Sequence, residues 1–230
     1  SKKDFDRLSD FIFNNYGIKM PEIKHIMLQS RLQKRLRALN FDNFESYVKY
    51  VFSSKGREEV VHMIDVVSTN KTDFFREPQH FDFLREIVLT EAFNHSKQRY
   101  FKIWSAGCSS GEEVYTLAIV LSEFAEKNFG VDFSILGTDI STQVLQKASE
   151  AVYSMDKVDV IPIELKKKYL LRSKNKEKQS IRIIPELRSK TSYQRLNFMD
   201  NTYSVSDNFD IIFCRNVLIY FDRLTQEKVI

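Results

Sequence analysis

The sequence contains few cysteines and no long apolar segment. Only two cysteines, Cys108 and Cys214, occur among its 230 residues, whereas a secreted domain stabilised by disulfides would usually carry more. No run of about 18 apolar residues is present that could span a membrane. The first residues also lack the apolar core and cleavage site of a signal peptide. The sequence therefore predicts a cytoplasmic protein that does not insert into a membrane.

Histidine is scarce and the net charge is small. The four histidines, at positions 25, 62, 80 and 95, are not spaced from one another or from a cysteine like zinc ligands, so no metal site is predicted. A net charge of +4 is too small to indicate nucleic-acid binding. The positive charge is concentrated in two stretches, Lys24–Arg37 and Lys166–Lys190. Such stretches favour an acidic partner.

Apolar residues at three- and four-residue spacing predict helices in the first 70 residues. Leu28, Leu32, Leu36 and Leu39 mark one face of the second helix, and Pro21 suits its first position. The expected helices, which together form an N-terminal helical domain over residues 1–69, are Phe5–Tyr16, Pro21–Leu39, Phe44–Phe52 and Arg57–Val67.

Basic residues lie on a second side of the same helix. Lys24, Arg31, Lys34 and Arg35 are displaced from the leucines. A charged helix face of this kind is either solvated or a surface for an acidic partner, and the charge pattern alone leaves both interpretations open.

From Arg99 onward, short apolar runs alternate with helical stretches, which is typical of a parallel sheet covered by helices. The predicted class of this domain, residues 70–230, is therefore α/β. Its expected strands are Tyr100–Ser105, Asp132–Gly137 and Phe209–Cys214, and its expected helices are Glu112–Asn128 and Thr142–Ala151.

A lysine-rich stretch interrupts this alternation at about residues 156–191. It contains a helix, Ile163–Leu171, a polar loop, Arg172–Ser180, and a short strand, Ile181–Ile184. We interpret it as a small inserted β subdomain. The sequence stops at Ile230, where a doubly wound sheet would still need further strands, so we expect C-terminal strands to be missing.

The segment Ile103–Gly111 has the layout of a ligand site. A strand, a glycine-containing turn and a helix place backbone N–H groups at the carboxyl end of the sheet. The segment does not match the dinucleotide pattern G-x-G-x-x-G. Glu112 and Glu113 follow it and disfavour an anionic pyrophosphate. Two interpretations of these acids remain open: they face a cationic ligand, or they complement the helix dipole.

Asp139 ends the next predicted strand region, in Gly137-Thr138-Asp139. A carboxylate at that position can accept hydrogen bonds from both hydroxyls of a ribose. It could instead act as the N-cap of the helix that begins near Thr142.

Four ordered motifs resemble those of CheR-type chemoreceptor methyltransferases. The resemblance runs through the whole length, and its motifs are Asn70-Lys-Thr-Asp-Phe-Phe-Arg-Glu77, Ile103-Trp-Ser-Ala-Gly-Cys-Ser-Ser-Gly-Glu-Glu113, Thr138-Asp-Ile140 and Phe209-Asp-Ile-Ile-Phe-Cys-Arg-Asn-Val-Leu-Ile-Tyr-Phe-Asp222. This chain has Ala106-Gly107-Cys108 where the family commonly has Ala-Ala or Ala-Cys before the serine. The resemblance implies a Rossmann-like S-adenosylmethionine methyltransferase sheet behind a helical domain. The implied reaction forms glutamyl methyl esters on receptors in bacterial chemotaxis.

The same resemblance implies the residues that hold the cofactor. Glu113 would face the methionine ammonium group, Asp139 the ribose, and Asn197 with Phe198 the adenine side. The remaining cofactor positions implied by the motifs are Asn70, Thr72, Arg76, Arg215 and Asn216. The product would be S-adenosylhomocysteine.

No general base is expected, because a glutamate carboxylate is already ionised near neutral pH. The enzyme would mainly position the carboxylate in line with the methyl group and the sulfur. We expect Arg76 to orient the substrate carboxylate and Tyr220 to shape the methyl region. The alternative is that both residues only hold the cofactor.

The partner implied by the resemblance is a set of glutamate-rich cytoplasmic receptor helices. The family presents a basic helix toward them, which suggests substrate contacts for Arg31, Lys34, Arg35 and Arg37. Some relatives also grip a receptor's C-terminal pentapeptide through glycines of the β subdomain. The corresponding loop, Arg172–Ser180, has no glycine, which argues against such tethering.

The sequence also admits three rival functions. A methyltransferase-like domain could sense S-adenosylmethionine or scaffold signalling proteins without turnover. A nicotinamide-dependent oxidoreductase is disfavoured by the missing G-x-G-x-x-G. A cysteine nucleophile is disfavoured because no histidine lies in a motif near Cys108 or Cys214.

Overall fold

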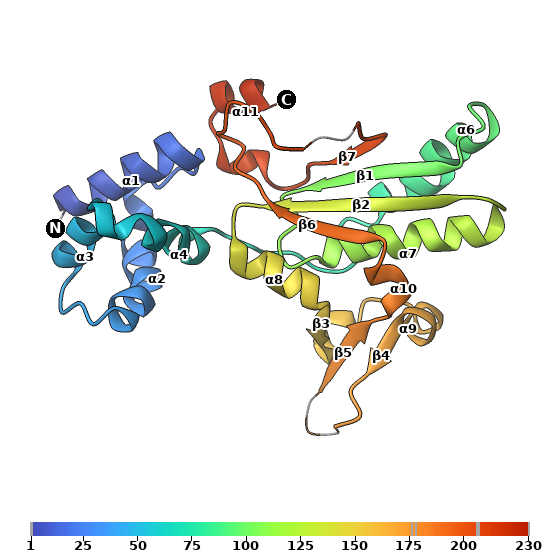
Figure 1. Cartoon of the computed structure of the whole chain (residues 1–230), viewed down its shortest axis with the longest axis horizontal. Helices are drawn as coiled ribbons and strands as arrows, with labels where there is room; N and C mark the ends of the chain where they lie inside the picture. The colour runs from blue at the N-terminus through green and yellow to red at the C-terminus, as the bar shows by residue number, and fades with distance from the viewer. Residues whose placement is uncertain (1, 176, 178, 206–207, 230) are drawn as a thin grey trace.

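The structure, a computed structural model, describes residues 2–175, 177, 179–205 and 208–229. Its helical part lies at the left of Figure 1, and a sheet flanked by helices lies at the right. Each part has a hydrophobic cluster of its own. The first includes Leu8, Leu28 and Tyr47, and the second includes Ile103 and Leu117.

Four α-helices form the helical part, close to the predicted positions. They are α1 Lys2–Tyr16, α2 His25–Ala38, α3 Phe44–Val51 and α4 Arg57–Val67, with 3-10 turns η1 Glu22–Lys24 and η2 Ser54–Gly56. Leu28, Leu32 and Leu36 of α2 are buried, which confirms the predicted apolar face. The prediction that Pro21 opens this helix is wrong. Pro21 has extended backbone angles and precedes η1, so a 3-10 turn separates it from α2.

A helical stretch that the sequence analysis did not predict follows the segment joining the two parts. It comprises α5 Gln79–Phe83, a π-helical turn η3 Leu84–Val88, and α6 Leu89–Asn94. The Thr90 hydroxyl donates to the carbonyl of Arg85, five residues earlier. This stretch packs against α7, Glu112–Lys127.

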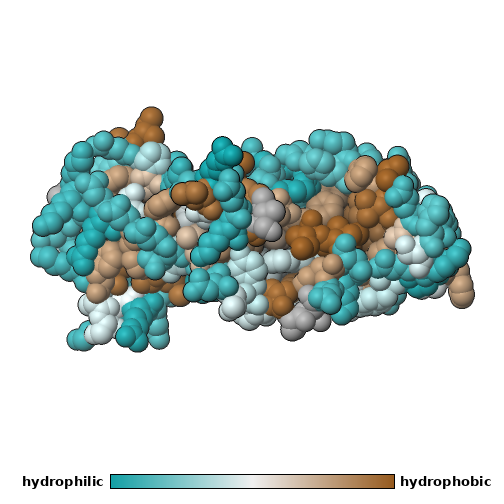
Figure 2. Space-filling view, turned by 90° about the horizontal axis from the view of Figure 1, so that it is seen from above, coloured by the Kyte–Doolittle hydropathy of each residue, from teal (hydrophilic) through white to brown (hydrophobic). Residues whose placement is uncertain are grey.

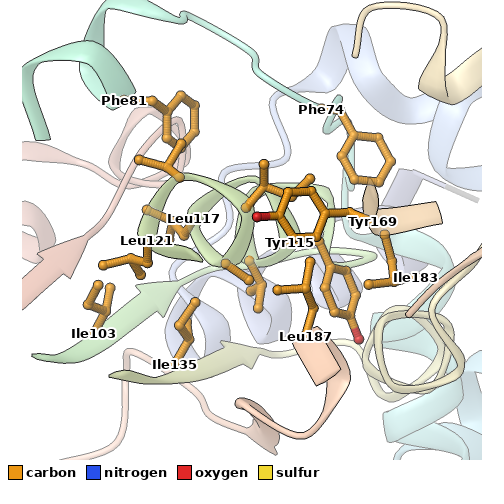
Figure 3. Close-up of a cluster of buried hydrophobic side chains, with 14 of the residues drawn as sticks. Phe74, Phe81, Ile103, Tyr115, Leu117, Leu121, Ile135, Tyr169, Ile183 and Leu187 are labelled. Atoms are coloured by element: carbon orange, nitrogen blue, oxygen red, sulfur yellow. The ribbon is translucent and has the colours of Figure 1, made fainter. Parts of the chain in front are cut away.

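The main sheet contains four parallel strands in the order β6-β2-β1-β7. Their bounds are β1 Tyr100–Ala106, β2 Asp132–Asp139, β6 Thr191–Arg195 and β7 Ile211–Phe213. Alternate residues of β1 and β2 are buried against α7, and Ile103 and Ile135 lie beside Leu117 and Leu121 in Figure 3. Together with α7 and α8, Thr142–Glu150, this arrangement confirms the predicted Rossmann-like α/β class.

Several strand predictions need correction. The second strand extends two residues further, to Asp139, because its partner β6 pairs with it as far as Asp139↔Arg195. The strand β6 was not predicted from the sequence, because it is an edge strand whose residues Thr191–Arg195 are mostly polar. The predicted strand Phe209–Cys214 is shorter, since only Ile211–Phe213 pair with β1.

The predicted insertion is a three-stranded antiparallel subdomain in the order β3-β5-β4, below the sheet in Figure 1. Its elements are β3 Val152–Ser154, η4 Met155–Val158, α9 Ile163–Tyr169, β4 Leu170–Arg172, β5 Ser180–Ile183 and α10 Pro185–Arg188. The insertion therefore begins earlier than predicted. The helix also ends at Tyr169, because Leu170 pairs with Ile183 of β5.

The chain ends in η5, Leu218–Tyr220, and α11, Arg223–Val229. None of the helices that the structure describes is both long and apolar enough to cross a membrane. Figure 2 shows a mostly hydrophilic upper face with apolar patches, including some over the half that holds the sheet. Ile212 of the edge strand β7 is one apolar residue that stays exposed, by 56%.

Candidate functional site

A pocket lies between the helical part and the carboxyl edge of the main sheet. Its walls come from α1 and α2, the joining segment Val67–Asp73, the turn after β1, the end of β2, and the segments that follow β6 and β7. All ten residues that the resemblance implies for cofactor binding and catalysis line it: Asn70, Thr72, Arg76, Glu113, Asp139, Asn197, Phe198, Arg215, Asn216 and Tyr220.

The turn between β1 and α7 forms one wall of the pocket. The backbone N–H groups of Gly107 and Cys108 both donate to the carbonyl of Thr138, at 2.8 Å. Gly107 has a φ of 86°, in the left-handed region, and a Cβ there would overlap the side chain of Val217. Since only glycine lacks a Cβ, this close approach of two loops requires glycine at 107.

Glu113 is the acid that faces the pocket. Its Oε1 accepts a hydrogen bond from the Ser105 hydroxyl at 2.8 Å, and its Oε2 lies 3.3 Å from Nη1 of Arg215. Burial raises the pKa of the Glu113 carboxyl above its usual value, and the contacts with Ser105 and Arg215 oppose that rise. The pocket therefore holds a buried carboxylate whose charge a bound cation would stabilise.

Glu112, in contrast, does not line the pocket. Its side chain accepts from the Ser110 hydroxyl at 2.7 Å and lies 3.8 Å from the Lys157 ammonium. Burial also raises its pKa. Of the two acids left open by the sequence, only Glu113 is placed to meet a ligand in this pocket.

Arg215 connects the pocket to a residue that the sequence analysis did not assign, Glu77. The Nη2 of Arg215 donates to the carbonyl of Arg76, and it also donates to Oε2 of Glu77 at 3.0 Å. Asn216 donates to the other oxygen of Glu77 at 3.2 Å. These two hydrogen bonds lower the pKa of Glu77. Within the described residues, the buried Nε of Arg215 has no hydrogen-bond partner.

Unusual backbone angles occur at three residues around the pocket, as well as at residues away from it such as Asn40, Lys97 and Ala151. Glu77, Ser109 and Asn216 have φ values of 55°, 49° and 57°, in the left-handed region that non-glycine residues rarely adopt. Such strain gathers at functional sites, where the surrounding contacts hold it in place. Glu77 stands in the first sequence motif, but only its contact with Arg215 across 138 residues reveals its part in the site.

Asp139 ends β2 at the pocket edge. Its two oxygens accept backbone hydrogen bonds from Ser109 at 2.9 Å and from Ser141 at 3.0 Å. The alternative that Asp139 caps the next helix is wrong, because Ser141 is the N-cap of α8 and its hydroxyl accepts from Val144. Burial raises the pKa of Asp139, and the backbone donors oppose it. A carboxylate with two such donors still has lone pairs for further hydroxyl groups.

The joining segment is held against the sheet from both sides. The Ser109 hydroxyl donates to the carbonyl of Asn70 at 2.9 Å. On the other side, the Lys157 ammonium donates to the carbonyl of Thr72 at 2.9 Å and to Asp73 at 2.8 Å. Arg76 donates to the carbonyl of Lys71 at 3.0 Å. These contacts fix the wall that carries Asn70, Thr72 and Arg76.

The helical part closes the opposite wall, which the sequence analysis did not foresee. Tyr16, Met20 and Met27 line the pocket together with Phe198 and Tyr220. Asn197 donates to the carbonyl of Asn15 at 2.8 Å, and the backbone N–H of Lys19 donates to the carbonyl of Tyr220 at 3.4 Å. No local pattern could have indicated these contacts, because they join residues about 180–200 positions apart.

The four basic residues predicted to contact substrate lie outside the pocket lining and are not equivalent. Arg35 is paired with Glu59, which is 3% exposed, and its Nε donates to Oε1 at 2.8 Å. Arg31 donates to the carbonyls of Val67 and Ser68 at the end of α4. Lys34 and Arg37 are exposed. The predicted basic face is thus half engaged in contacts within the chain.

The cysteines offer no nucleophile at the pocket. Cys108 is buried and Cys214 is partly buried, and burial raises the pKa of both thiols. A raised pKa lowers the thiolate fraction, which is the reactive form. In the part of the chain that the structure describes, no cluster of three histidine, cysteine or acidic side chains could hold a metal.

Comparison with known proteins identifies similar sequences over the full chain. Residues 70–230 match the family described as CheR methyltransferase, SAM binding domain, and residues 3–68 match its all-alpha domain. A chemotaxis protein methyltransferase of Borreliella burgdorferi is 42% identical over 100% of this chain and 81% of its own length. Chemotaxis protein methyltransferase 2 of Pseudomonas aeruginosa is 34% identical, with 100% and 80% covered. The chemotaxis protein methyltransferase of Salmonella typhimurium is 33% identical over 100% of this chain and 77% of its own length.

The residues present fit S-adenosylmethionine. The buried Nε of Arg215, which lacks a partner among the described residues, can donate to a ligand carboxylate. Glu113 offers a carboxylate for an ammonium group, and Asp139 keeps acceptor capacity for ribose hydroxyls. The lining thus supplies complementary groups for the carboxylate, the ammonium group and the ribose of the cofactor.

Proposed function

Because the chain belongs to the CheR methyltransferase family, a family of S-adenosylmethionine-dependent methyltransferases of chemotaxis, we propose that it forms methyl esters on glutamate side chains. The substrates would be glutamate-rich helices of chemoreceptors on the cytoplasmic side of the membrane. The product of the cofactor would be S-adenosylhomocysteine.

The observation that carries this proposal is the meeting of Glu113, Arg76 and Tyr220 in one pocket. Glu113 provides the carboxylate for the cofactor's ammonium group. Arg76 and Tyr220 come from two other segments, so the same cavity offers a cation and an aromatic ring beside the cofactor. The cofactor's own carboxylate can be met by the Nε of Arg215, which lacks a partner among the described residues, and this leaves Arg76 for an incoming glutamate.

The chemistry requires positioning rather than proton transfer. Bound S-adenosylmethionine supplies an electrophilic methyl group on a sulfonium. A glutamate carboxylate is ionised well below neutral pH, so no residue of the chain has to remove a proton. The chain instead has to hold the carboxylate in line with the methyl group, and a correctly held pair of reactants gains a large rate advantage. Excluding water also helps, because opposite charges neutralise each other as the bond forms.

Arg76 and Tyr220 are the residues to which we assign this positioning. The Arg76 side chain is 32% exposed and donates one hydrogen bond to the carbonyl of Lys71. Its remaining N–H groups can meet a substrate carboxylate from the open side of the pocket. Tyr220 lies where η5 meets the helical part, with its carbonyl accepting from Lys19, and would shape the region around the methyl group.

Steering of an acidic receptor helix is assigned to the basic side of α2. Lys34 and Arg37 present exposed positive charge. Arg31 binds only neutral oxygens and so keeps its charge, whereas Arg35 is neutralised by Glu59. We therefore expect Arg31, Lys34 and Arg37 to supply the field that draws in the substrate, and this contribution should fall as salt is raised.

The test is incubation with methyl-labelled S-adenosylmethionine and an acidic receptor fragment. The proposal expects base-labile label on glutamate side chains of the fragment. Tight cofactor binding without transfer would instead identify a sensor or scaffold and overturn the proposal. Transfer to a base-stable position would exclude a methyl ester.

Two variants test the assigned roles. Tyr220→Phe and Arg76→Ala should lower turnover more than they weaken cofactor binding. If both variants kept near-normal turnover with normal cofactor affinity, the catalytic assignment would be wrong. Lys55→Ala, a change of an exposed lysine on η2 away from the pocket, serves as the control.

A further inference from the structure

Three isoleucines near the pocket mouth are exposed to an extent that folding does not explain. Ile23, Ile26 and Ile219 are 91%, 78% and 70% exposed. Single exposed apolar residues are ordinary on a protein surface, but a group of them beside a ligand site indicates a surface that another molecule covers.

Two of the three lie on the helical side of the mouth. Ile23 is next to Lys24 and one helical turn before Met27, and both of these neighbours line the pocket. Residues three and four apart share one side of a helix, so Ile23, Ile26 and Met27 form a single apolar strip. The strip runs from the pocket wall out to the surface.

The third lies on the sheet side. Ile219 lines the pocket itself while staying 70% exposed, which places it at the rim. It adjoins Tyr220, whose carbonyl accepts a hydrogen bond from the backbone of Lys19. Lys19 stands four residues before Ile23, so the two sides of the rim approach each other at this hydrogen bond.

Positive charge surrounds the same mouth. Lys24 and Lys71 line the pocket, and in the described part of the chain neither forms an ion pair. Among the described residues, the Lys24 ammonium donates one hydrogen bond, to the carbonyl of Lys19 at 3.4 Å. Arg76 also lines the pocket, with its Nε 3.9 Å from Oε1 of Glu77. A covering molecule should therefore combine carboxylates with aliphatic side chains.

We propose that Ile23, Ile26 and Ile219 form an apolar rim that docks an amphipathic, acidic substrate helix. This inference rests on the proposed function and adds a substrate preference to it. The glutamate to be methylated enters the pocket while aliphatic side chains three or four residues away pack on the rim, as neighbours on one helix face do. The enzyme then selects glutamates by their apolar neighbours, and Lys24 and Lys71 meet the other carboxylates of the helix.

The test compares two double variants, each of which replaces two exposed aliphatic residues by serine. Ile23→Ser with Ile26→Ser changes the rim. Val160→Ser with Ile163→Ser changes two residues of the inserted subdomain that are 61% and 60% exposed. The rim variant should raise KM for an acidic receptor fragment by about tenfold, with kcat and the Kd for S-adenosylmethionine unchanged. The control variant should leave all three values unchanged.

A matched change in the substrate makes the test specific. In a fragment whose aliphatic residues three and four positions from the glutamate are replaced by serine, wild type and rim variant should have the same KM. An unchanged KM in the rim variant, or an equal rise in the control variant, overturns the proposal. So would a concentration-dependent dimer of the wild type that the rim variant abolishes, since the rim would then cover a second copy of the chain.

Binding of the fragment, measured by fluorescence anisotropy without cofactor turnover, separates this inference from the proposed function. If wild type forms no base-labile ester, the proposed function fails. Weaker fragment binding by the rim variant than by the control variant would still support the rim. Should the double variant unfold, Ile26→Ser alone is measured against Ile163→Ser alone, with the same expected direction.

Discussion

Arg215 and Glu113 meet at the pocket with Nη1 of the arginine 3.3 Å from Oε2 of the glutamate. They come from opposite ends of the sheet domain sequence, one after β7 and the other at the start of α7. The arginine side chain is 11% exposed and the glutamate side chain 15%. This pair keeps a carboxylate in a place where burial alone would favour its neutral form.

Replacing Glu113 by glutamine should weaken cofactor binding. The change removes a charge-assisted contact to an ammonium group, which corresponds to roughly 1.5–3 kcal/mol and so to a tenfold or larger rise in Kd. Isothermal titration calorimetry with S-adenosylmethionine measures it. Glu112→Gln is the matched control, because Glu112 is the adjacent glutamate, is 2% exposed, and lies outside the pocket lining. Equal losses in both variants would contradict the role given to Glu113.

Cofactor affinity should fall as pH is lowered at values above the usual carboxyl pKa of 4.5. Burial raises the folded-state pKa of Glu113, so the carboxyl takes up a proton at higher pH than an exposed glutamate does. Binding an ammonium group favours the ionised form, and binding must therefore release a proton as pH falls through that raised pKa. The sign is opposite for stability: a raised carboxyl pKa stabilises the free protein at low pH, and that contribution is lost as pH rises through the raised pKa.

The measurement is the Kd for S-adenosylmethionine between about pH 8 and about pH 5. Calorimetric titrations in two buffers of different ionisation enthalpy give the number of protons released on binding. The Glu113→Gln variant should lose the part of the dependence that comes from this residue. A wild-type affinity that stays flat across the range would disprove the linkage.

Gly107→Ala should destabilise the protein more than Gly130→Ala. Both glycines have left-handed backbones, with φ of 86° and 83°, so each alanine costs about 1–2 kcal/mol for its conformation. Only at Gly107 would the new Cβ also overlap a neighbour, Val217, whereas at Gly130 the nearest atom is 3.9 Å away. Urea unfolding compares the two free energies. Similar losses would mean that the contact between the turn and Val217 can relax.

Arg35→Met should destabilise the helical domain by about 3 kcal/mol, since it leaves the buried carboxylate of Glu59 without its cation. Lys34→Met, one position away and exposed, should change the free energy of unfolding by less than about 0.5 kcal/mol. Thermal unfolding measures both. These free energies of unfolding are needed to interpret methylation assays of variants on the basic side of α2, because a loss of activity on changing Arg35 would reflect unfolding. An Arg35 variant as stable as the Lys34 variant would argue against the buried pair.

The sequence by itself determined the local elements of this protein. The spacing of Leu28, Leu32 and Leu36 predicted the buried face of α2, because a helix repeats every 3.6 residues whatever lies around it. The apolar runs of β1 and β2 predicted two strands of a parallel sheet, because short apolar runs that alternate with helical stretches are typical of strand-helix-strand units. The four motifs also identified the segments that surround the pocket, because each motif is continuous in the chain.

Only the tertiary structure decided which of those side chains act together. It placed β6 in the sheet although its residues are polar, because an edge strand is held by backbone pairing with β2. It directed Glu113 into the pocket and Glu112 out of it, although both follow the same turn. It also paired Arg35 with Glu59 in a salt bridge and placed Glu77 within hydrogen-bond distance of Arg215. These outcomes depend on contacts between residues far apart in sequence, and the distance and burial that set their energies exist only once the chain has folded.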